Sequence, residues 1–160
     1  MTSVEQLRAW IDEPEGERLE FKSAKRNYHF GKLLDYCVAL ANEGGGKIIL
    51  GVTDARPRTV VGTEAFAEPG RTSAGIHQKL NHRVPIEEMV LDGGRVLVAH
   101  VPSRLPGTAW HHDGRYLRRA GDDLVPIPPE ELQQMLAEGG PDFSATPSEA
   151  SLSDLDGDAV

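Results

Sequence analysis

Hydrophobic and polar positions change their period sharply between residues 30 and 54, and this change defines two elements. Apolar residues first recur at helical spacing, at Leu33, Leu34, Cys37, Val38 and Ala41. The pattern predicts a helix over residues 30–43, ended by the left-handed cap that Gly44 or Gly45 supplies. Residues 47–52, KIILGV, are almost continuously apolar, which is typical of a central strand covered on both faces.

Two further elements are predicted before this helix. Ser3 is a suitable N-cap for a first helix, with an apolar stripe made by Leu7, Trp10 and Ile11. Residues 18–22, RLEFK, alternate in polarity and predict a short strand. Its apolar side chains, Leu19 and Phe21, should share one face, and Glu20 and Lys22 the other.

The second half of the chain predicts hairpins and two more helices. We expect a short strand at Val60–Val61, a helix over residues 73–81, a hairpin of residues 86–91 and 95–101, a second hairpin of residues 109–112 and 115–120, and a final helix starting at Pro128–Pro129. In the first hairpin, Val96, Val98 and Val101 should mark the core face. Helices and strands are interleaved, so the predicted fold class is α+β, with a mixed sheet, hairpins and helices packed on it.

The last 22 residues differ in composition from the rest. Residues 139–160 are rich in Ser, Pro and Gly, contain five acids and lack Lys and Arg. We therefore expect one domain over residues 1–138 and an acidic, disordered tail or linker over residues 139–160. The net charge is -8 for the whole chain; removing the five tail acids leaves 17 basic and 20 acidic residues, or -3, for the domain. That value gives no support to broad electrostatic binding of nucleic acid, although a local basic patch is compatible with it.

The sequence has no signal peptide pattern and no apolar run long enough to cross a membrane. A single cysteine, Cys37, cannot form an internal disulfide, and its place on the apolar side of a helix argues against a nucleophilic role. The expected location is the cytoplasm.

The glycines at positions 44–46 invite comparison with a phosphate-binding loop. Such a loop follows a strand and precedes a helix, so that the helix N-terminus faces the anion. Here the order is reversed. A tight helix-to-strand connection is the favoured interpretation, with approach of the loop amides to a ligand as the alternative.

Carboxylates near the first strand are candidate metal ligands. Glu13, Glu15, Glu17 and Glu20 form an acidic cluster in the sequence, and Asp54 follows the central strand. Two of these carboxylates with Asp54 could hold a divalent cation through oxygen ligands, and such a cation can activate water against a phosphodiester.

Residues 114–123, GRYLRRAGDD, contain the densest basic cluster in the latter half of the chain: Arg115, Arg118 and Arg119. Arginine can bind phosphate bidentately, and Tyr116 could stack on a base. The alternative is that Arg119 pairs with an acid such as Glu20 or Asp54 and stabilises the sheet. The sequence leaves both interpretations open.

Three segments, in this order, resemble the Schlafen AlbA_2 family, also called divergent AAA-4 or Alba-2. They are LEFK (residues 19–22), ALANEGGGKIILGVTD (residues 39–54) and YLRRAGDDLVPIPPEEL (residues 116–132). The resemblance covers residues 5–138. It implies an α+β domain with a mixed sheet, of the kind found in bacterial DNA-binding and ATP-binding proteins.

In vertebrate Schlafen relatives, the related fold carries a metal-dependent endoribonuclease with three acids, two of them in an E-x4-E-F-K motif. The resemblance implies that Glu15, Glu20 and Asp54 are the corresponding metal ligands and catalytic residues here, with Lys22 beside them. It also places Arg119 at the arginine of the family's Tyr-x-x-Arg-x-Gly segment. Those enzymes build a groove from two lobes, and a homodimer of this chain would supply the second.

Three functions follow as hypotheses. The first is a module that binds RNA or DNA, with Lys22, Lys25, Arg26, Arg118 and Arg119 as phosphate contacts and Tyr116 as a stacking residue. The second is an endoribonuclease dependent on Mg²⁺ or Mn²⁺ through Glu15, Glu20 and Asp54. The third is a non-catalytic regulatory or nucleotide-binding module.

Overall fold

The computed structural model describes residues 1–13, 18–121, 123–138, 155–156 and 158–159. The chain divides into two units. The first unit comprises Met1–Arg104 and Trp110–Pro126, and the second comprises Leu105–Ala109 and Ile127–Val160. Strands β1 to β6 belong to the first unit.

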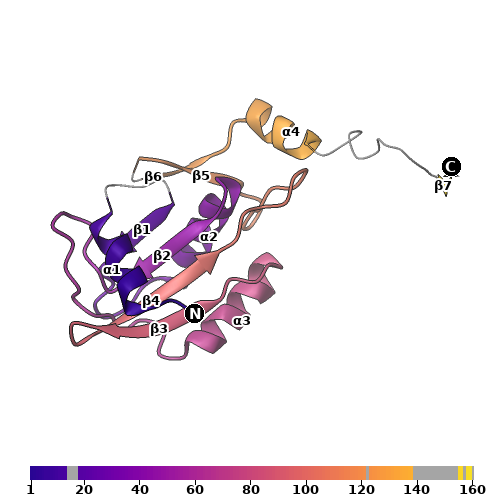
Figure 1. Ribbon diagram of the computed structural model, residues 1–160. Coiled ribbons are helices and arrows are strands. Elements are labelled where there is room, and N and C mark those ends of the chain that lie inside the picture. The colour runs from indigo at the N-terminus through magenta and orange to yellow at the C-terminus, as the bar shows by residue number, and fades with distance from the viewer. Residues whose placement is uncertain (14–17, 122, 139–154, 157, 160) are drawn as a thin grey trace. The chain divides into compact units, whose positions relative to one another are not determined.

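A mixed four-stranded sheet forms the centre of the first unit (Figure 1). Its strand order is β1 (Leu19–Lys22), β2 (Gly46–Leu50), β4 (Gly94–Val101), β3 (Ile86–Leu91). β1 and β2 are parallel, and the other two pairings are antiparallel. The predicted fold class, α+β with a mixed sheet and helices packed on it, is confirmed.

Helices cover both faces of this sheet, which explains the nearly continuous apolar run of β2. Helix α1 (Val4–Asp12) packs Leu7 and Ile11 against a cluster that contains Phe21, Ile49 and Val98. Helices α2 (Phe30–Asn42) and α3 (Pro69–Leu80) contribute to the other cluster, with Ile48, Leu50, Leu97, Ala99 and Val101. Alternate residues of β2 and β4 therefore enter opposite cores.

The predicted boundaries of the first elements are close to those observed. Ser3 is the N-cap of α1, and its side chain accepts a hydrogen bond from the Gln6 amide. Helix α2 ends at Asn42, and Gly44 and Gly45 follow it with φ of 110° and 90°. A Cβ at Gly45 would lie 2.9 Å from the Val101 carbonyl oxygen, so this turn packs tightly against backbone. The glycine run is a helix-to-strand connection, as the element order predicts.

Two local predictions between β2 and β3 were wrong. Val60 makes only an isolated bridge with Val52, and no strand forms at Val60–Val61. Helix α3 begins at Pro69 rather than Ser73, because Pro69 suits the first helical turn and the Ser73 hydroxyl instead donates to the Val84 carbonyl at 2.6 Å.

Two further predictions were wrong, one about the core face of β4 and one about the length of β2. Val96 and Val98 share one core, whereas Val101 faces the other, so no single core face exists in β4. The central strand ends at Leu50, since Gly51 adopts a φ of 100°.

The second predicted hairpin was also wrong in its pairing. The Asp113-Gly114 turn closes only one bridge, between His112 and Arg115. Strand β5 (Leu117–Ala120) pairs with β6 (Asp123–Pro126) instead.

Asn42 explains why the predicted hairpin stops. Its side-chain amide donates to the carbonyls of Trp110 and Leu117, each at 3.0 Å, and its oxygen accepts from the Trp110 amide at 2.8 Å. Asn42 therefore takes backbone groups that a longer hairpin would have paired.

The second unit contains α4 (Pro129–Ala137), which begins as the two prolines predict and buries Met135. The structure also assigns the two-residue strands β7 (Leu155–Asp156) and β8 (Asp158–Ala159). The predicted disordered tail, residues 139–160, falls mainly outside the described residues. None of the helices in the described ranges is long and apolar enough to cross a membrane.

Candidate functional site

Glu20 lies at the sheet edge in an ion-pair network that fixes Arg119. Glu20 is only 8% exposed, and its Oε1 lies 3.0 Å from Arg119 Nη1. Glu43, directly after α2, accepts from Arg119 Nε at 3.1 Å and from the Arg119 amide at 2.8 Å. Two carboxylates therefore hold the arginine between β1, β5 and the end of α2. This pairing with Glu20 is one of the two alternatives that the sequence left open.

Lys22 occupies the same face of β1 as Glu20. Its Nζ lies 3.4 Å from Glu20 Oε2 and 4.9 Å from the centre of the Tyr36 ring. Burial alone would lower the pKa of Lys22, but a hydrogen bond with Tyr36 and the attraction of Tyr36 and Glu20 outweigh burial and raise this pKa. Nearby, burial together with Tyr36 and Glu20 raises the pKa of the Tyr28 phenol, whose buried oxygen has no hydrogen-bond partner among the described residues.

The proposed acidic triad is not assembled by the residues that the structure describes. Glu15 lies outside them, and Asp54 is exposed beyond the end of β2. Both oxygens of Glu20 already face cations, Arg119 and Lys22. Within the described ranges, no group of three His, Cys, Asp or Glu side chains is placed to hold a metal ion. The described part of the chain thus does not provide a ligand set for Mg²⁺ or Mn²⁺, and the triad stays a prediction.

A second set of predicted residues borders an open groove of about 690 Å³ in the first unit. We call this the Lys25 groove; its lining is Lys25, Arg26, Val61, Gly62, Thr63, Glu64, Ala67, Gly93, Gly94 and Arg95. Lys25 and Arg26 follow β1 directly and are exposed. No described residue forms an ion pair or hydrogen bond with either side chain.

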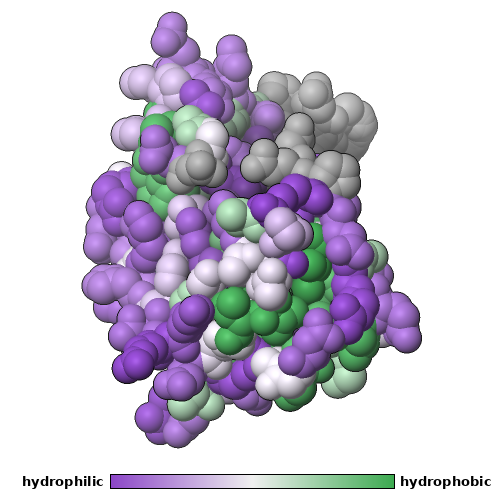
Figure 2. Space-filling view, turned by 90° about the vertical axis from the view of Figure 1, so that its left-hand side faces the viewer, coloured by the Kyte–Doolittle hydropathy of each residue, from purple (hydrophilic) through white to green (hydrophobic). Residues whose placement is uncertain are grey.

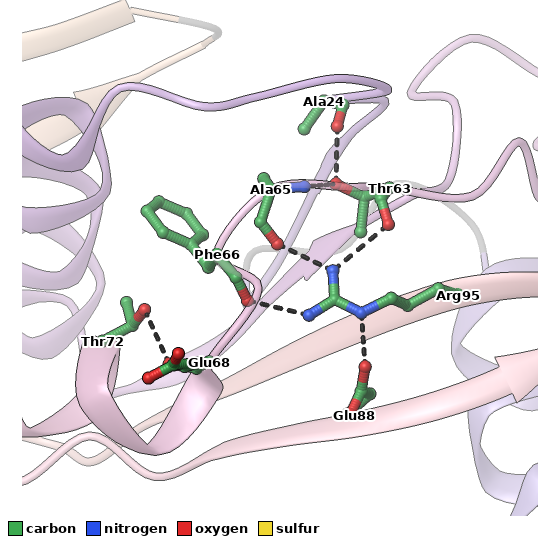
Figure 3. Close-up of polar contacts among 8 residues, drawn as sticks. All are labelled: Ala24, Thr63, Ala65, Phe66, Glu68, Thr72, Glu88 and Arg95. Carbon is green, nitrogen blue, oxygen red and sulfur yellow. Dashed lines mark hydrogen bonds and ion pairs between the residues drawn. The ribbon is translucent and has the colours of Figure 1, made fainter.

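Arg95 also lines the groove, but its guanidinium is directed into the protein. Figure 3 shows it between the loop of residues 63–66 and strand β3. Nη1 donates to the carbonyls of Thr63 and Ala65 at 3.2 and 2.7 Å, and Nη2 donates to that of Phe66 at 2.8 Å. Nε donates to Glu88. Arg95 therefore holds the groove wall in one conformation.

Thr63 connects this wall to the loop that carries the two basic residues. Its buried hydroxyl donates to the Ala24 carbonyl at 2.5 Å and accepts from the Ala65 amide at 3.0 Å (Figure 3). The Glu64 amide also donates to the Lys25 carbonyl at 2.9 Å. The backbone at Lys25 is thus fixed, while its side chain stays exposed.

The remaining predicted residues lie in or beside β5. Tyr116 packs against the His111 ring with a centroid distance of 5.0 Å. Arg118 is half-buried in β5. Arg115, a member of the same basic cluster, lies 2.8 Å from Asp35. At least two of the three arginines in this basic cluster, Arg115 and Arg119, therefore pair with carboxylates.

Two further features are the buried Cys37 thiol and the exposed apolar side chains. Burial raises the pKa of the Cys37 thiol to about 12, which agrees with the inert thiol expected from the sequence. Among the described residues, the large apolar side chains that are exposed are Met1, Val4, Val90, Leu105 and Leu136. The face in Figure 2 is hydrophilic over much of its surface, with hydrophobic residues gathered toward its centre and right.

Sequence reasoning missed Glu43, Tyr36, Thr63 and Arg95. Glu43 stands at the helix end beside the glycines, where its charge suggested no particular partner. Arg95 occupies the start of a strand and resembled an exposed polar position. No local signal distinguishes either residue, because their partners are far along the chain.

Comparison with known proteins identifies the fold and the family. The family described as Schlafen, AlbA_2 matches residues 15–128. No curated protein matches the chain. Sixteen chains of solved structure do match.

The DIP2311 protein from Corynebacterium diphtheriae has a TM-score of 0.63 and 19% identity, over 84% of this chain and 31% of its own. This chain thus spans about a third of that protein, and the likeness shows the fold alone. The N-terminal domain of a RecG-related protein from Nitrosomonas europaea has a TM-score of 0.46 and 23% identity, over 78% of this chain and 90% of its own.

Proposed function

This chain belongs to the Schlafen AlbA_2 family, and we propose that it is a nucleic-acid-binding domain whose phosphate contacts are made by the loop after β1. The observation that carries this proposal is the position of Lys25 and Arg26. Both are exposed at the Lys25 groove, and neither has a carboxylate partner in the described part of the chain. Exposed, unneutralised cations are the groups that can replace counterions on a phosphate backbone.

The other predicted phosphate contacts support the proposal less well. Arg119 is 11% exposed, and both Glu20 and Glu43 hold its guanidinium. Lys22 is directed toward Glu20 and Tyr36. A phosphate would have to displace these partners, at a cost that the exposed Lys25 and Arg26 do not incur.

The charge of the domain is compatible with local binding only. A net charge of -3 over residues 1–138 creates no attractive field for a polyanion. Affinity should therefore depend on few contacts and fall as salt rises, rather than reflect a broad basic surface.

Metal-dependent cleavage is the second candidate from the sequence, and the described geometry favours it less. Glu20 is neutralised by Arg119 and Lys22, and Asp54 is exposed. Purified protein should be incubated with RNA and Mn²⁺ beside its Glu20→Gln variant. Cleavage that this variant abolishes while retaining its fold would establish the ribonuclease and displace a purely binding role.

Binding is tested by fluorescence anisotropy with labelled RNA and DNA of mixed sequence, between about 50 and 200 mM salt. We expect affinity that weakens with salt and is reduced in the double variant Lys25→Ala/Arg26→Ala. The matched control is Lys79→Ala/Arg83→Ala, which removes the same charge from exposed positions outside the groove. Absence of binding at the lowest salt would contradict the proposal.

A further inference from the structure

We propose that the Lys25 groove binds the sugar-phosphate backbone of a nucleic acid strand and leaves the bases unread. The inference rests on the proposed function and specifies the ligand chemistry of its site. Recognition would then be independent of sequence, because phosphate contacts carry no base information.

Two cationic side chains of the Lys25 groove are available to a ligand. Three basic residues line the groove, but four of the five N–H donors of Arg95 are directed to three carbonyls and to Glu88. Lys25 and Arg26 remain, and they are adjacent in sequence. The groove therefore offers about two phosphate contacts.

The described residues that line the Lys25 groove provide no surface for base stacking. No aromatic side chain is among the described residues that line the groove. The adjacent Phe66 is packed edge-to-face against Phe30, with a centroid distance of 6.4 Å. Sites that bind single strands through their bases use exposed rings as stacking platforms, and the described lining of this groove contains none.

The groove wall is built from closely packed backbone. A Cβ on Gly94 would lie 2.8 Å from Val60 Cγ1 and 3.2 Å from the Gly62 nitrogen. Arg95 and Thr63 fix the facing loop through backbone carbonyls. A fixed wall lowers the entropic cost of binding and leaves the flexible part of the site in the two basic side chains.

Glu64 allows a test in which a substitution should raise the affinity for phosphate instead of lowering it. Its side chain is exposed, lines the groove and has no partner in the described ranges. With Arg95 paired to Glu88, the groove carries two positive charges and this one negative charge. Removal of the Glu64 charge should strengthen phosphate binding, and misfolding cannot produce a gain in affinity.

The experiment measures affinity against salt for the four DNA homopolymers, with the full chain, Lys25→Ala/Arg26→Ala and Glu64→Gln. We expect similar affinities for all four. The double variant should lower the slope of log affinity against log salt by about 1.4, the value for two phosphate contacts on a single strand. Glu64→Gln should tighten binding about two- to fivefold, the range of one exposed charge pair.

Competition with inorganic phosphate and a mononucleotide distinguishes a polymer backbone from a terminal phosphate. We expect neither to displace the homopolymers at equal phosphate concentration. Displacement by either would overturn the inference in favour of a phosphomonoester site.

The remaining outcomes separate the inference from the proposed function. If the full chain binds no nucleic acid, the proposed function fails, and the inference with it. If the chain binds but the double variant retains the full affinity and slope, only the inference fails. A preference above about tenfold for one homopolymer that the double variant loses would also overturn it, because base contacts would then dominate.

Discussion

The loop after β1 and strand β5 both carry adjacent basic residues, but their surroundings differ. In β5, Arg119 is nearly buried and held by Glu20 and Glu43. In the loop, Lys25 and Arg26 are exposed and have no partner among the described residues. The number of basic residues in a segment therefore says little about phosphate binding; the presence of a carboxylate partner decides it.

The physical reason lies in the different cost of leaving each charge unpaired. Glu20 is 8% exposed, and an unpaired buried carboxylate is strongly unfavourable. Arg119 is therefore needed by the fold. Exposed Lys25 and Arg26 are solvated, and the fold loses little when their charges are removed.

The largest expected effect is that of Arg119→Ala on stability. The change leaves Glu20 buried without its arginine, and we expect the free energy of unfolding to fall by about 3 kcal/mol. Urea denaturation measures this loss. Adding Glu20→Gln to the variant should recover part of it, because the uncompensated charge is removed. A loss below about 0.5 kcal/mol would show that Arg119 in β5 contributes as little to stability as the exposed basic residues of the loop, and would contradict the comparison.

A smaller effect should follow Asn42→Ala. This change removes three hydrogen bonds to the backbone of Trp110 and Leu117. We expect a loss of about 2 kcal/mol, since those backbone groups lose their partner. Denaturation should be compared with Asn27→Ala, which alters an exposed residue in the loop before α2. Equal losses in both variants would mean that Asn42 does not fasten the segment before β5.

The contrast between a paired and an unpaired charge also applies to two carboxylates in the described part of the chain, Glu87 and Glu64. Burial alone would raise the pKa of Glu87, but hydrogen bonds from Thr2 and His100 lower it to about 2 from an ordinary 4.5. The stabilisation is thus fully present above pH 4.5 and is lost as pH falls from there through about 2. The Glu64 side chain has no such partners among the residues that the structure describes.

We therefore expect Glu87→Gln to cost about 1.5 kcal/mol at neutral pH and to flatten the acid branch of the stability curve. Thermal or urea unfolding between those two pH values checks this. Glu64→Gln is the control and should leave the curve unchanged. An identical acid branch in wild type and Glu87→Gln would contradict the assigned hydrogen bonds.

Elements specified by local pattern were predictable from the sequence. The Ser3 cap, the end of α2 and the β3–β4 turn depend on residues close in the chain, and the structure places them within a few positions of the prediction. The second hairpin was not predictable, because Asn42 lies 68 positions from Trp110, whose backbone it binds. A contact of that kind leaves no periodic signal near either residue.

Contacts between residues far apart in the chain also limited the prediction of the candidate sites. Lys25 and Arg26 were identified by charge alone, but their exposure depends on Thr63 and the loop after β2. Arg119 and Glu20 are 99 positions apart, so the sequence could name the pairing only as one alternative. Arg95 was missed because three of its four partners are backbone carbonyls, which no residue type reveals.

The most direct test compares Arg26→Ala with Arg115→Ala in salt-dependent binding to single-stranded DNA. Both arginines are exposed and each variant removes one charge, but Arg115 lies 2.8 Å from Asp35, whereas Arg26 has no described partner. The expected result is a slope lowered by about 0.7 for Arg26→Ala alone. If Arg115→Ala lowers the slope of log affinity against log salt and Arg26→Ala leaves it unchanged, nucleic acid binds beside β5. That result would contradict phosphate binding at the Lys25 groove.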